Sequence, residues 1–490
     1  MRKHIRNPNA WFFAQAAALL ALAALLKPHI SLDSIGYINY FPHFDTAKHF
    51  LQQIFSSNRT FGYPLFLKAA GLFAPELRLL PFFQYATHVM AVFIFFKGLQ
   101  RFRVSGWLAL FIASALLYDK TVLGMFRYAI TDSLAVSFTI MAAGILMILV
   151  ANPRSRITWA ALVLVVFYNY QIRPSCMYLI GLAPALAVFL LYFREKLESR
   201  KYSLFAAAGM FSKLFVINLI PFVLFCSLRL SLVNDFGVVS FTGMNIIGIA
   251  GQLMRADKVK DLPEDVRPLA EELVKARITH NLPDGFTEFH WKDVPAFEKN
   301  HNLYIWSTSV PISQKMYEKQ GANKKRGYDA TWIIMNKKLT RLSLCIIAQN
   351  PRVYEKMVLF TFLRGVIVQY DVSDKITYRL NKVSYITYAF TAAWLASIAL
   401  TFLISVFRNR KNKGEGSVGL RTETADYGRW IILVIALSNF ALQMLLISLV
   451  EFSLERLVFA PWVFVHAALA SETYSAWQRT INTRNAARQS

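Results

Sequence analysis

Residues 32–64 read LDSIGYINYFPHFDTAKHFLQQIFSSNRTFGYP, and they follow directly on an apolar run, Ala10–Leu26. An apolar run of this length can cross a bilayer as a helix, so the segment after it is expected to emerge on the opposite side. This segment carries two acids, Asp33 and Asp45, an arginine, Arg59, and several aromatic and glycine residues. A loop that only connected two spans would not need this composition. We therefore interpret residues 32–64 as an active-site loop of a membrane enzyme.

The composition of the whole chain indicates a membrane protein. Of its 490 residues 55% are hydrophobic and only 17% are charged, and long apolar runs recur from Trp11 to Ala470. A soluble chain of this length would carry far more charge. The net charge of +25 would suggest nucleic acid in a soluble protein. Here we expect no nucleic-acid partner, because cytoplasmic loops of membrane proteins retain Lys and Arg and because membrane lipids attract them.

The apolar runs predict ten transmembrane helices. They are Ala10–Leu26, Leu79–Leu99, Ser105–Tyr118, Thr131–Val150, Thr158–Tyr170, Cys176–Phe193, Leu214–Leu232, Ile386–Val406, Trp430–Leu449 and Leu457–Leu469. The seventh is taken to begin at Leu214, after an interfacial segment, because a start at Leu204 would bury Lys213. Two stretches that are too short to span, Ala47–Phe55 and Tyr63–Phe73, are expected to lie along the outer interface.

The distribution of basic residues predicts the orientation. With the N-terminus inside, all six inner segments are basic: RKHIR, QRFR, NPRSR, REKLESRK, RNRKNK and RTINTR. The turns after the third, fifth and ninth spans are poorer in Lys and Arg. This asymmetry is the one that positions membrane helices, so we expect a multi-pass protein with both termini in the cytoplasm.

The longest polar segment, residues 233–384, is expected to form a soluble cap on the outer face. It contains an amphipathic stretch, Glu264–Ile278, and a second helical stretch, Tyr328–Ala348, which Asn350-Pro351 should end. The predicted fold is therefore an all-α polytopic membrane protein with interfacial helices and an α or α/β cap. Its parts are an N-terminal membrane module (1–232) with the first outer loop at 27–78, the cap (233–384), and a C-terminal membrane module (385–490) with a cytoplasmic tail.

Four acidic or basic residues at the predicted outer surface are candidates for chemistry. Asp33 follows the first span and Asp132 begins the fourth, so both are expected at the same depth on the same face. Acids so close to hydrocarbon are costly and tend to mark functional cavities. The alternative for Asp132 is a helix N-cap, favoured by the helix dipole. Glu451 and Arg456, in EFSLER between the last two spans, are either part of a site or an ordinary interfacial pair.

Basic residues near the outer ends of spans need a partner, because the positive-inside rule disfavours them there. They are Arg59, Lys68, Arg78, Arg127, Arg173, Arg229 and Arg364. A phosphate group held by the guanidinium fork is one explanation, and a lipid head group is the other. Arg173 is the best phosphate candidate, because Pro174 restricts the turn that aims it. The histidines at positions 43, 49 and 88 show no metal-ligand spacing.

Two motifs resemble a known family. DSIGY at residues 33–37, followed by RTFGYP at residues 59–64, resembles the first outer loop of GT-C glycosyltransferases. That superfamily includes family 39 protein mannosyltransferases and the lipid A aminoarabinose transferases. Thr131-Asp132 is similar to the acid that begins the family's fourth span, and ERLVFAPW around Arg456 loosely resembles its E-R-Y-x-x-P element. The chain departs from the pattern in having Asp-Ser for two acids and Phe61 for the usual proline, and residues 233–384 show no resemblance.

The resemblance implies an enzyme of the bacterial cytoplasmic (inner) membrane. It would move a sugar, with inversion at the anomeric carbon, from a polyprenyl-phosphate donor to a glycolipid, lipopolysaccharide, polysaccharide or protein acceptor on the outer face. Asp33 would deprotonate an acceptor hydroxyl, or position a phosphate acceptor. Asp132 would orient the site or help to bind a metal. The leaving phosphate would be stabilised by arginine or by a bound divalent cation. The donor-phosphate contacts are Arg59, Arg173 and Arg127, and the substrate contacts are Tyr37, Tyr63, Glu451 and Arg456.

Two other functional classes remain open. A transporter or flippase of lipid-linked sugars would share the membrane architecture, but the chain shows no internal repeat and no acid in the middle of a span. A polysaccharide polymerase or ligase is also polytopic with a large outer loop. Proteins of that class would not be expected to carry the DSIGY and GYP elements.

Overall fold

The computed structural model describes residues 7–40, 51, 54–119, 122, 125–280, 282–322, 330–367, 420–450 and 463–475. Within these residues the chain is helical and contains no β-strand, and its one isolated bridge pairs His29 with Tyr128. The predicted all-α fold is therefore confirmed, and the described part of the predicted cap is α rather than α/β.

Six helices among the described residues are long and apolar enough to cross a membrane. They are α2 (Pro8–Leu25), α6 (Leu80–Arg101), α9 (Thr131–Ala151), the run Pro174–Leu197 formed by η2 (Pro174–Tyr178) and α11 (Leu179–Leu197), α12 (Leu204–Val233), and Arg429–Leu449 within α20 (Leu420–Val450). Two shorter helices, α7 (Gly106–Leu117) and α10 (Arg156–Ile172), pack against them. The chain is thus built as an all-α membrane protein.

The predicted count of ten spans is only partly covered by the structure. The eighth predicted span, Ile386–Val406, lies outside the described residues, as does the first half of the tenth. The third and fifth are present as α7 and α10, which have 12 and 17 residues and fall short of a full span by length. The predicted interfacial helix Ala47–Phe55 also lies largely outside the described residues. The other predicted interfacial helix, Tyr63–Phe73, is present as α5 (Gly62–Gly71).

The start of the seventh predicted span is wrong. One continuous helix of 30 residues, α12, begins at Leu204, where the Ser203 hydroxyl accepts a hydrogen bond from the Ala206 amide (3.3 Å). Lys213 is not buried by this arrangement, because its side chain faces outward from the bundle. A long lysine side chain on an exposed helix face can extend toward the membrane surface, so it does not force the helix to begin later.

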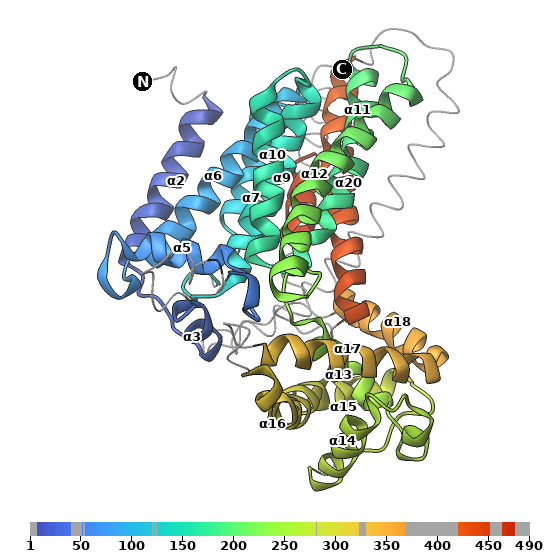
Figure 1. Ribbon diagram of the computed structural model, residues 1–490. Coiled ribbons are helices and arrows are strands. Elements are labelled where there is room, and N and C mark those ends of the chain that lie inside the picture. The colour runs from blue at the N-terminus through green and yellow to red at the C-terminus, as the bar shows by residue number, and fades with distance from the viewer. Residues whose placement is uncertain are drawn as a thin grey trace.

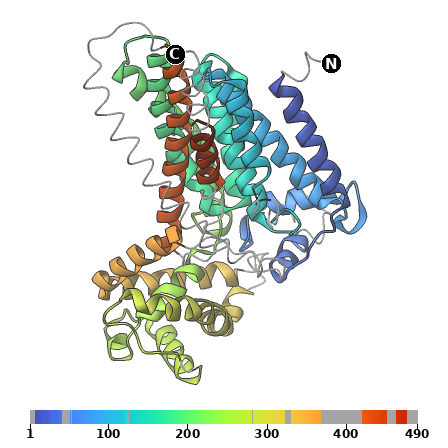
Figure 2. The same ribbon diagram turned by 180° about the vertical axis from the view of Figure 1, so that it is seen from behind.

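The helices form a bundle with a second, helical body at one end (Figures 1 and 2). In the bundle α6 packs along α9, α2 lies against α6 and α7, and α11 contacts both α12 and α20. Glycine permits the closest of these approaches, because a Cβ on Gly144 would lie 2.6 Å from the Phe95 nitrogen. Small residues at such crossings let helix backbones meet inside a membrane.

The body at the end of the bundle, residues 242–367, is named here the helical head. Its helices are α13 (Thr242–Leu253), α14 (Arg267–Thr279), α15 (Val294–Asn302), the π-helical turn η5 (Leu303–Ser309), α16 (Val310–Gly321), α17 (Thr331–Gln349) and α18 (Pro351–Ile367). It has an apolar core of its own, which includes Leu269, Leu273 and Leu339. The predicted helices Glu264–Ile278 and Tyr328–Ala348 are confirmed to within three residues as α14 and α17. As expected, α17 ends before Asn350-Pro351, and α18 begins there.

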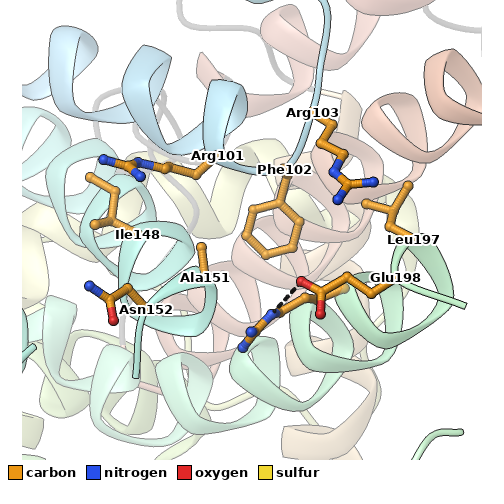
Figure 3. A pocket seen from close by; sticks show the side chains of 9 residues that line it. Arg101, Phe102, Arg103, Ile148, Ala151, Asn152, Leu197 and Glu198 are labelled. Atoms are coloured by element: carbon orange, nitrogen blue, oxygen red, sulfur yellow. Dashed lines mark hydrogen bonds and ion pairs between the residues drawn. The ribbon is translucent and has the colours of Figure 1, made fainter. Parts of the chain in front are cut away.

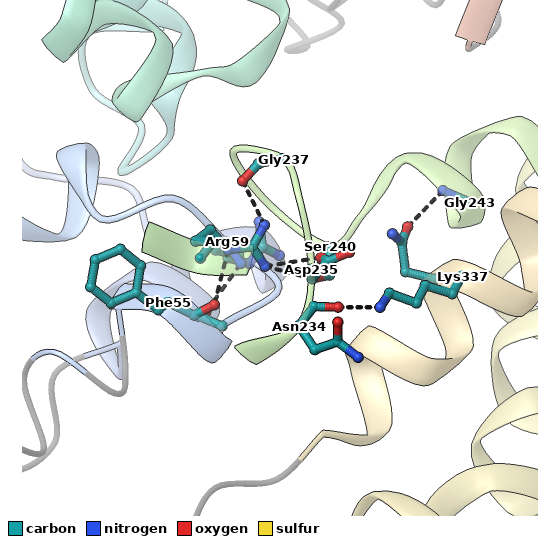
Figure 4. A network of polar contacts seen from close by, with 11 residues as sticks. Phe55, Arg59, Asn234, Asp235, Gly237, Ser240, Gly243 and Lys337 are labelled. Atoms are coloured by element: carbon teal, nitrogen blue, oxygen red, sulfur yellow. Dashed lines mark hydrogen bonds and ion pairs between the residues drawn. The ribbon is translucent and has the colours of Figure 1, made fainter. Parts of the chain in front are cut away.

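Arg229, near the end of α12, joins the bundle to the segment that leads into the helical head. Figure 4 labels its partners Phe55, Asp235, Gly237 and Ser240. Its side chain is fully buried, and its Nε donates to the Phe55 carbonyl (3.0 Å). Its Nη1 donates to the Gly237 carbonyl (2.8 Å), and its Nη2 reaches Ser240 Oγ (2.7 Å) and Asp235 Oδ2 (3.2 Å). A buried guanidinium with all these acceptors has a structural role. The two partners that the sequence suggested for Arg229, a phosphate group or a lipid head group, are therefore both wrong.

Candidate functional site

The turn that precedes α9 is fixed from two sides, and this places Asp132. His29, just after α2, donates its amide to the Arg127 carbonyl (2.7 Å). Gln84 of α6 donates to the Phe126 carbonyl (2.8 Å) and accepts a hydrogen bond from Ser133 Oγ (2.5 Å). These hydrogen bonds hold the turn before α9 to the segment that follows α2, and hold the first turn of α9 to α6. None of them involves Asp132.

Asp132 pairs with Arg173 across 41 residues of sequence. Arg173 Nη1 donates to Asp132 Oδ1, and the two side chains are only 13% and 1% exposed. Arg173 Nε donates to Ser175 Oγ (3.2 Å). Arg173 is extended (φ −143°) and precedes Pro174, which disfavours helical geometry in the residue before it. The proline therefore helps to aim the guanidinium, as the sequence predicted.

The N-cap interpretation of Asp132 is wrong. The N-cap of α9 is Ile130, and Asp132 lies in the first turn of the helix. The helix dipole still favours a negative charge there. However, the buried ion pair with Arg173 is the contact that distinguishes Asp132 from an ordinary first-turn acid.

The RTFGYP element, residues 59–64, lies against the end of α10 that leads into Arg173. Tyr168 donates its hydroxyl to the Gly62 carbonyl (2.8 Å), and Thr60 Oγ1 donates to the Ile172 carbonyl (3.4 Å). Gly62 meets the chain so closely that an added Cβ would lie 2.6 Å from the Gln171 carbonyl. The RTFGYP element is therefore in direct contact with the segment that leads into Arg173, and both were predicted from the sequence to have functional roles.

Asp33 and Arg59 lie on the solvent-accessible side of the candidate site, which is called its open side below. Asp33 sits in the first turn of α3 (Leu32–Ile38), where the sequence predicted a loop. Arg59 Nη2 lies 3.8 Å from Asp33 Oδ1, and the guanidinium carbon lies 4.4 Å above the Tyr37 ring. The Asp33 side chain is 46% exposed and that of Arg59 25% exposed. A pair this long and this exposed is weak, so both groups remain accessible to a ligand.

Tyr63 connects the open side to the buried ion pair. Its ring meets Tyr37 edge to face, with ring centroids 5.3 Å apart. Tyr63 is fully buried, and burial raises the pKa of its hydroxyl well above the usual value, with smaller contributions from Tyr37 and from the charge of Asp132. Within the described residues that hydroxyl has no hydrogen-bond partner. A buried hydroxyl without a partner is costly, which makes it a candidate contact for a bound molecule.

Further buried amides without full partners lie around the Asp132–Arg173 pair. Both polar atoms of the Gln171 side chain lack a hydrogen bond within the described part of the chain. The same holds for Asn439 Nδ2 and Gln443 Nε2 of α20, although Tyr178 donates to Asn439 Oδ1 (2.5 Å). Buried polar atoms normally find partners in the protein or in bound molecules. This part of the bundle therefore offers donors and acceptors to a polar ligand.

Arg127, Glu451 and Arg456 have no side-chain contact at this site that the structure describes. Arg127 contributes its carbonyl to the bridge with His29, but its side chain is exposed and has no hydrogen bond or ion pair with the described residues. Glu451 and Arg456 lie outside the described residues. His88 is buried, where it contacts Ser137 Oγ (3.2 Å) and the Leu116 carbonyl (3.1 Å).

A buried pair of a carboxylate and a histidine, Asp119 and His466, was not predicted from the sequence. Asp119, just after α7, is almost fully buried, and its Oδ2 is hydrogen-bonded to His466 Nδ1. The two residues are 347 positions apart, so no local pattern could link them. The signal available was an acid at the end of an apolar run, the same one that drew attention to Asp33. A carboxylate that holds an imidazole is an arrangement suited to proton transfer.

The predicted divalent cation receives no support from side-chain clustering. No group of three His, Cys, Asp or Glu side chains comes together among the residues that the structure describes. A cation at the leaving phosphate therefore stays a prediction, and none of the steps proposed below passes through one.

Comparison of the chain with protein-family models, with curated proteins and with solved structures found no match. The resemblance to GT-C glycosyltransferases thus stays a prediction from the motifs, and any functional conclusion depends on the geometry described above.

Replacing Gly62 by alanine is expected to destabilise the protein by about 1–3 kcal/mol, because the new methyl group would overlap the Gln171 backbone. The measurement is thermal unfolding of the purified protein in detergent. Gly181→Ala is the matched control, since nothing lies within 4 Å of an added Cβ there. That control should be neutral or stabilising by up to about 1 kcal/mol. Equal unfolding temperatures for both variants would show that residues 59–64 do not dock on α10.

Proposed function

We propose that the protein is a membrane glycosyltransferase that moves a sugar from a polyprenyl-phosphate donor to an acceptor on the outer face of the cytoplasmic membrane. The observation that carries the proposal is the contact between RTFGYP and the chain that leads into Arg173. Through this contact, one accessible carboxylate, Asp33, and two arginines belong to one site. That combination suits a reaction in which a hydroxyl loses a proton and a phosphate leaves.

The arginines would bind the donor phosphate. Arg173 is oriented by Asp132 and by Ser175, so its guanidinium is fixed before the substrate arrives. Pre-positioned donors stabilise the charge that develops on a leaving phosphate more than mobile ones do. Among the described residues the Arg59 guanidinium contacts the Tyr37 ring and lies loosely against Asp33, so it can turn toward the same phosphate. Arg127, exposed at the turn before α9, is assigned to the outer side of that phosphate.

Asp33 would act as the general base. It is the more accessible of the two predicted acids, whereas Asp132 is buried in its ion pair. Asp33 takes the proton of the acceptor hydroxyl as the acceptor oxygen bonds to the anomeric carbon. The bond from that carbon to the phosphate oxygen breaks, and polyprenyl phosphate leaves with the electron pair. Tyr37 and Tyr63 supply aromatic and hydroxyl contacts for the substrates. For a phosphate acceptor no base is needed, and Asp33 would only position it.

The test is a transfer assay with purified protein in liposomes and a donor radiolabelled in the sugar. A candidate acceptor is added to one sample and omitted from another. We expect labelled product and free polyprenyl phosphate only where protein and acceptor are both present. Label that crosses the bilayer while the sugar–phosphate bond stays intact would indicate a flippase instead. Repeated addition of the same unit would indicate a polymerase.

The proposed orientation makes a separate prediction. In a cysteine-free background, a cysteine at Asn302 in the helical head should react with an impermeant thiol reagent in intact spheroplasts. A cysteine at Ser199 should react only after permeabilisation, because α12 crosses the membrane once between the two positions. Both residues are exposed, so access to the reagent depends on the side of the membrane. Labelling of Ser199 with silence at Asn302 would reverse the orientation and place the site in the cytoplasm.

A further inference from the structure

A pocket of about 190 Å³ opens at the end of the bundle opposite to Asp132 (Figure 3). It lies where α6, α9 and α11 end, and its walls include Arg101, Arg103, Asn152 and Arg194. Asp132 is at the start of α9 and Asn152 follows its last residue, so a helix of 21 residues, about 30 Å in length, separates this pocket from the candidate active site. The pocket is therefore a second site and is not used by the proposed reaction.

The charge in the pocket is not balanced by the protein. Three arginines line it together with one acid, Glu198. Glu198 is already occupied, because Arg194 Nε donates to its Oε1 (3.1 Å) and Arg200 Nη1 lies 2.9 Å from its Oε2. The side chains of Arg101 and Arg103 have no hydrogen bond or ion pair with any residue that the structure describes. Figure 3 shows the side chains of Arg101 and Arg103 on either side of Phe102 at the rim of the pocket, where both residues are exposed.

Helix termini explain only one of these arginines. The C-terminal ends of helices favour cations, and Arg194 Nη1 indeed donates to the Val150 carbonyl at the end of α9 (2.8 Å). The guanidinium groups of Arg101 and Arg103 donate to no carbonyl among the described residues. Arg103 also has a left-handed backbone (φ 58°), which turns the chain sharply after α6 and brings its side chain to the same cavity as Arg101. This left-handed residue caps the C-terminus of α6, where the Val104 amide donates to the Leu99 carbonyl (3.2 Å).

The surroundings of the pocket are those of a membrane surface. Trp107, at the start of α7, and Ile157, at the start of α10, are large apolar side chains exposed at this end of the bundle. Tryptophan is enriched where hydrocarbon meets the head groups. Phe102 and Leu197 give the pocket itself an apolar wall beside the arginines. A ligand with an anionic head and an apolar tail would match both kinds of wall.

We propose that this pocket binds the phosphate group of an anionic phospholipid, with Arg101 and Arg103 as its principal ligands. Planar guanidinium groups bind phosphate oxygens in pairs, and basic pockets between membrane helices hold phospholipid head groups. The small volume of the pocket suits a phosphodiester rather than a whole sugar nucleotide. The site stands independently of the glycosyltransferase proposal. Free phosphate shares the chemistry of the lipid head group and is the alternative source of the ligand.

The experiment measures binding of phosphatidylglycerol to the full-length protein in neutral detergent, by native mass spectrometry. The double variant Arg101→Gln/Arg103→Gln should bind phosphatidylglycerol about tenfold or more weakly than the unaltered protein, because two charged hydrogen-bond donors are lost. Arg154→Gln is the control, since Arg154 is an exposed arginine at the same end of the bundle that does not line the pocket. It should bind as the unaltered protein does. Arg103→Lys keeps the charge but loses the planar fork, so an intermediate affinity is expected.

Two further arms identify the ligand. Phosphatidylcholine should bind no more tightly to the unaltered protein than to the double variant. Inorganic phosphate at the same concentration should not displace phosphatidylglycerol; arginine-dependent displacement by phosphate would make the soluble anion the ligand and overturn the lipid assignment. An equal loss of binding in Arg154→Gln would reduce the effect to general surface charge and overturn the site. Thermal unfolding without lipid checks that all variants are folded, and a double variant that is folded yet binds normally would also refute the proposal.

Discussion

Asp33→Asn is expected to lower turnover about 100-fold or more while the protein stays folded and still binds its lipid donor. Asparagine keeps the size and most of the hydrogen bonding of aspartate, but it cannot accept a proton from an acceptor hydroxyl. General base catalysis usually contributes at least this factor. The variant would leave the docking of residues 59–64 intact, because the Asp33–Arg59 contact is long and exposed. The measurement is the initial rate of sugar transfer at saturating donor, together with donor binding to the purified variant.

The matched control for Asp33 is Asp257→Asn in the helical head. Asp257 is also an exposed aspartate that pairs with an arginine, in this case Arg255 (3.0 and 2.8 Å). It lies outside the candidate site and should leave transfer unchanged. Full activity of Asp33→Asn on a hydroxyl acceptor would return Asp33 to a structural role in the first turn of α3, where asparagine can replace it.

Single and double substitutions of Asp132 and Arg173 should affect the stability of the protein and its rate of sugar transfer differently. Asp132→Asn alone leaves the Arg173 guanidinium without its buried partner, and Arg173→Gln alone leaves the carboxylate. Breaking a buried pair in this way costs about 3–5 kcal/mol. The double variant Asp132→Asn/Arg173→Gln buries no charge, so most of this stability should return. Thermal unfolding in detergent measures the effect.

Sugar transfer by the same double variant should stay low although its stability returns. Loss of the Arg173 charge at the leaving phosphate is expected to cost about 2–4 kcal/mol of transition-state stabilisation, which is roughly 30- to 1000-fold in rate. Recovery of both stability and transfer in the double variant would show that the pair only holds α9 against α10. Loss of transfer in all three variants, with stability restored in the double, would support the phosphate role of Arg173.

Most helices of the bundle could be predicted from the sequence with most of their bounds, whereas α3 could not, because residues 32–38 read as part of a loop. The helices α2, α6 and α9 begin and end within about two residues of the predicted spans. Their boundaries depend on local features, such as the length of an apolar run or a proline at the start, and the chain displays these directly. Two helices begin ten residues earlier than predicted: α12 at Leu204 and α20 at Leu420. Whether Lys213 is tolerated depends on which face of the helix meets its neighbours, and no local pattern contains that information.

The sequence also nominated Asp33, Arg59, Asp132 and Arg173 one by one, each from its position beside an apolar run. It did not predict which acid pairs with which arginine. Asp132 lies in α9 and Arg173 follows the last residue of α10, so the two meet because α9 and α10 pack together.

Only the tertiary structure decided the remaining roles. It buried Tyr63 between the two ion pairs, gave Arg229 three carbonyl or carboxylate partners and a serine hydroxyl, and joined Asp119 to His466 across 347 residues. It also brought Arg101 and Arg103 to a cavity instead of leaving them as ordinary basic residues of an inner segment. The physical reason is common to all of these: burial and pairing depend on which helix faces meet in three dimensions, whereas hydrophobic length and helix ends are properties of a single stretch of chain.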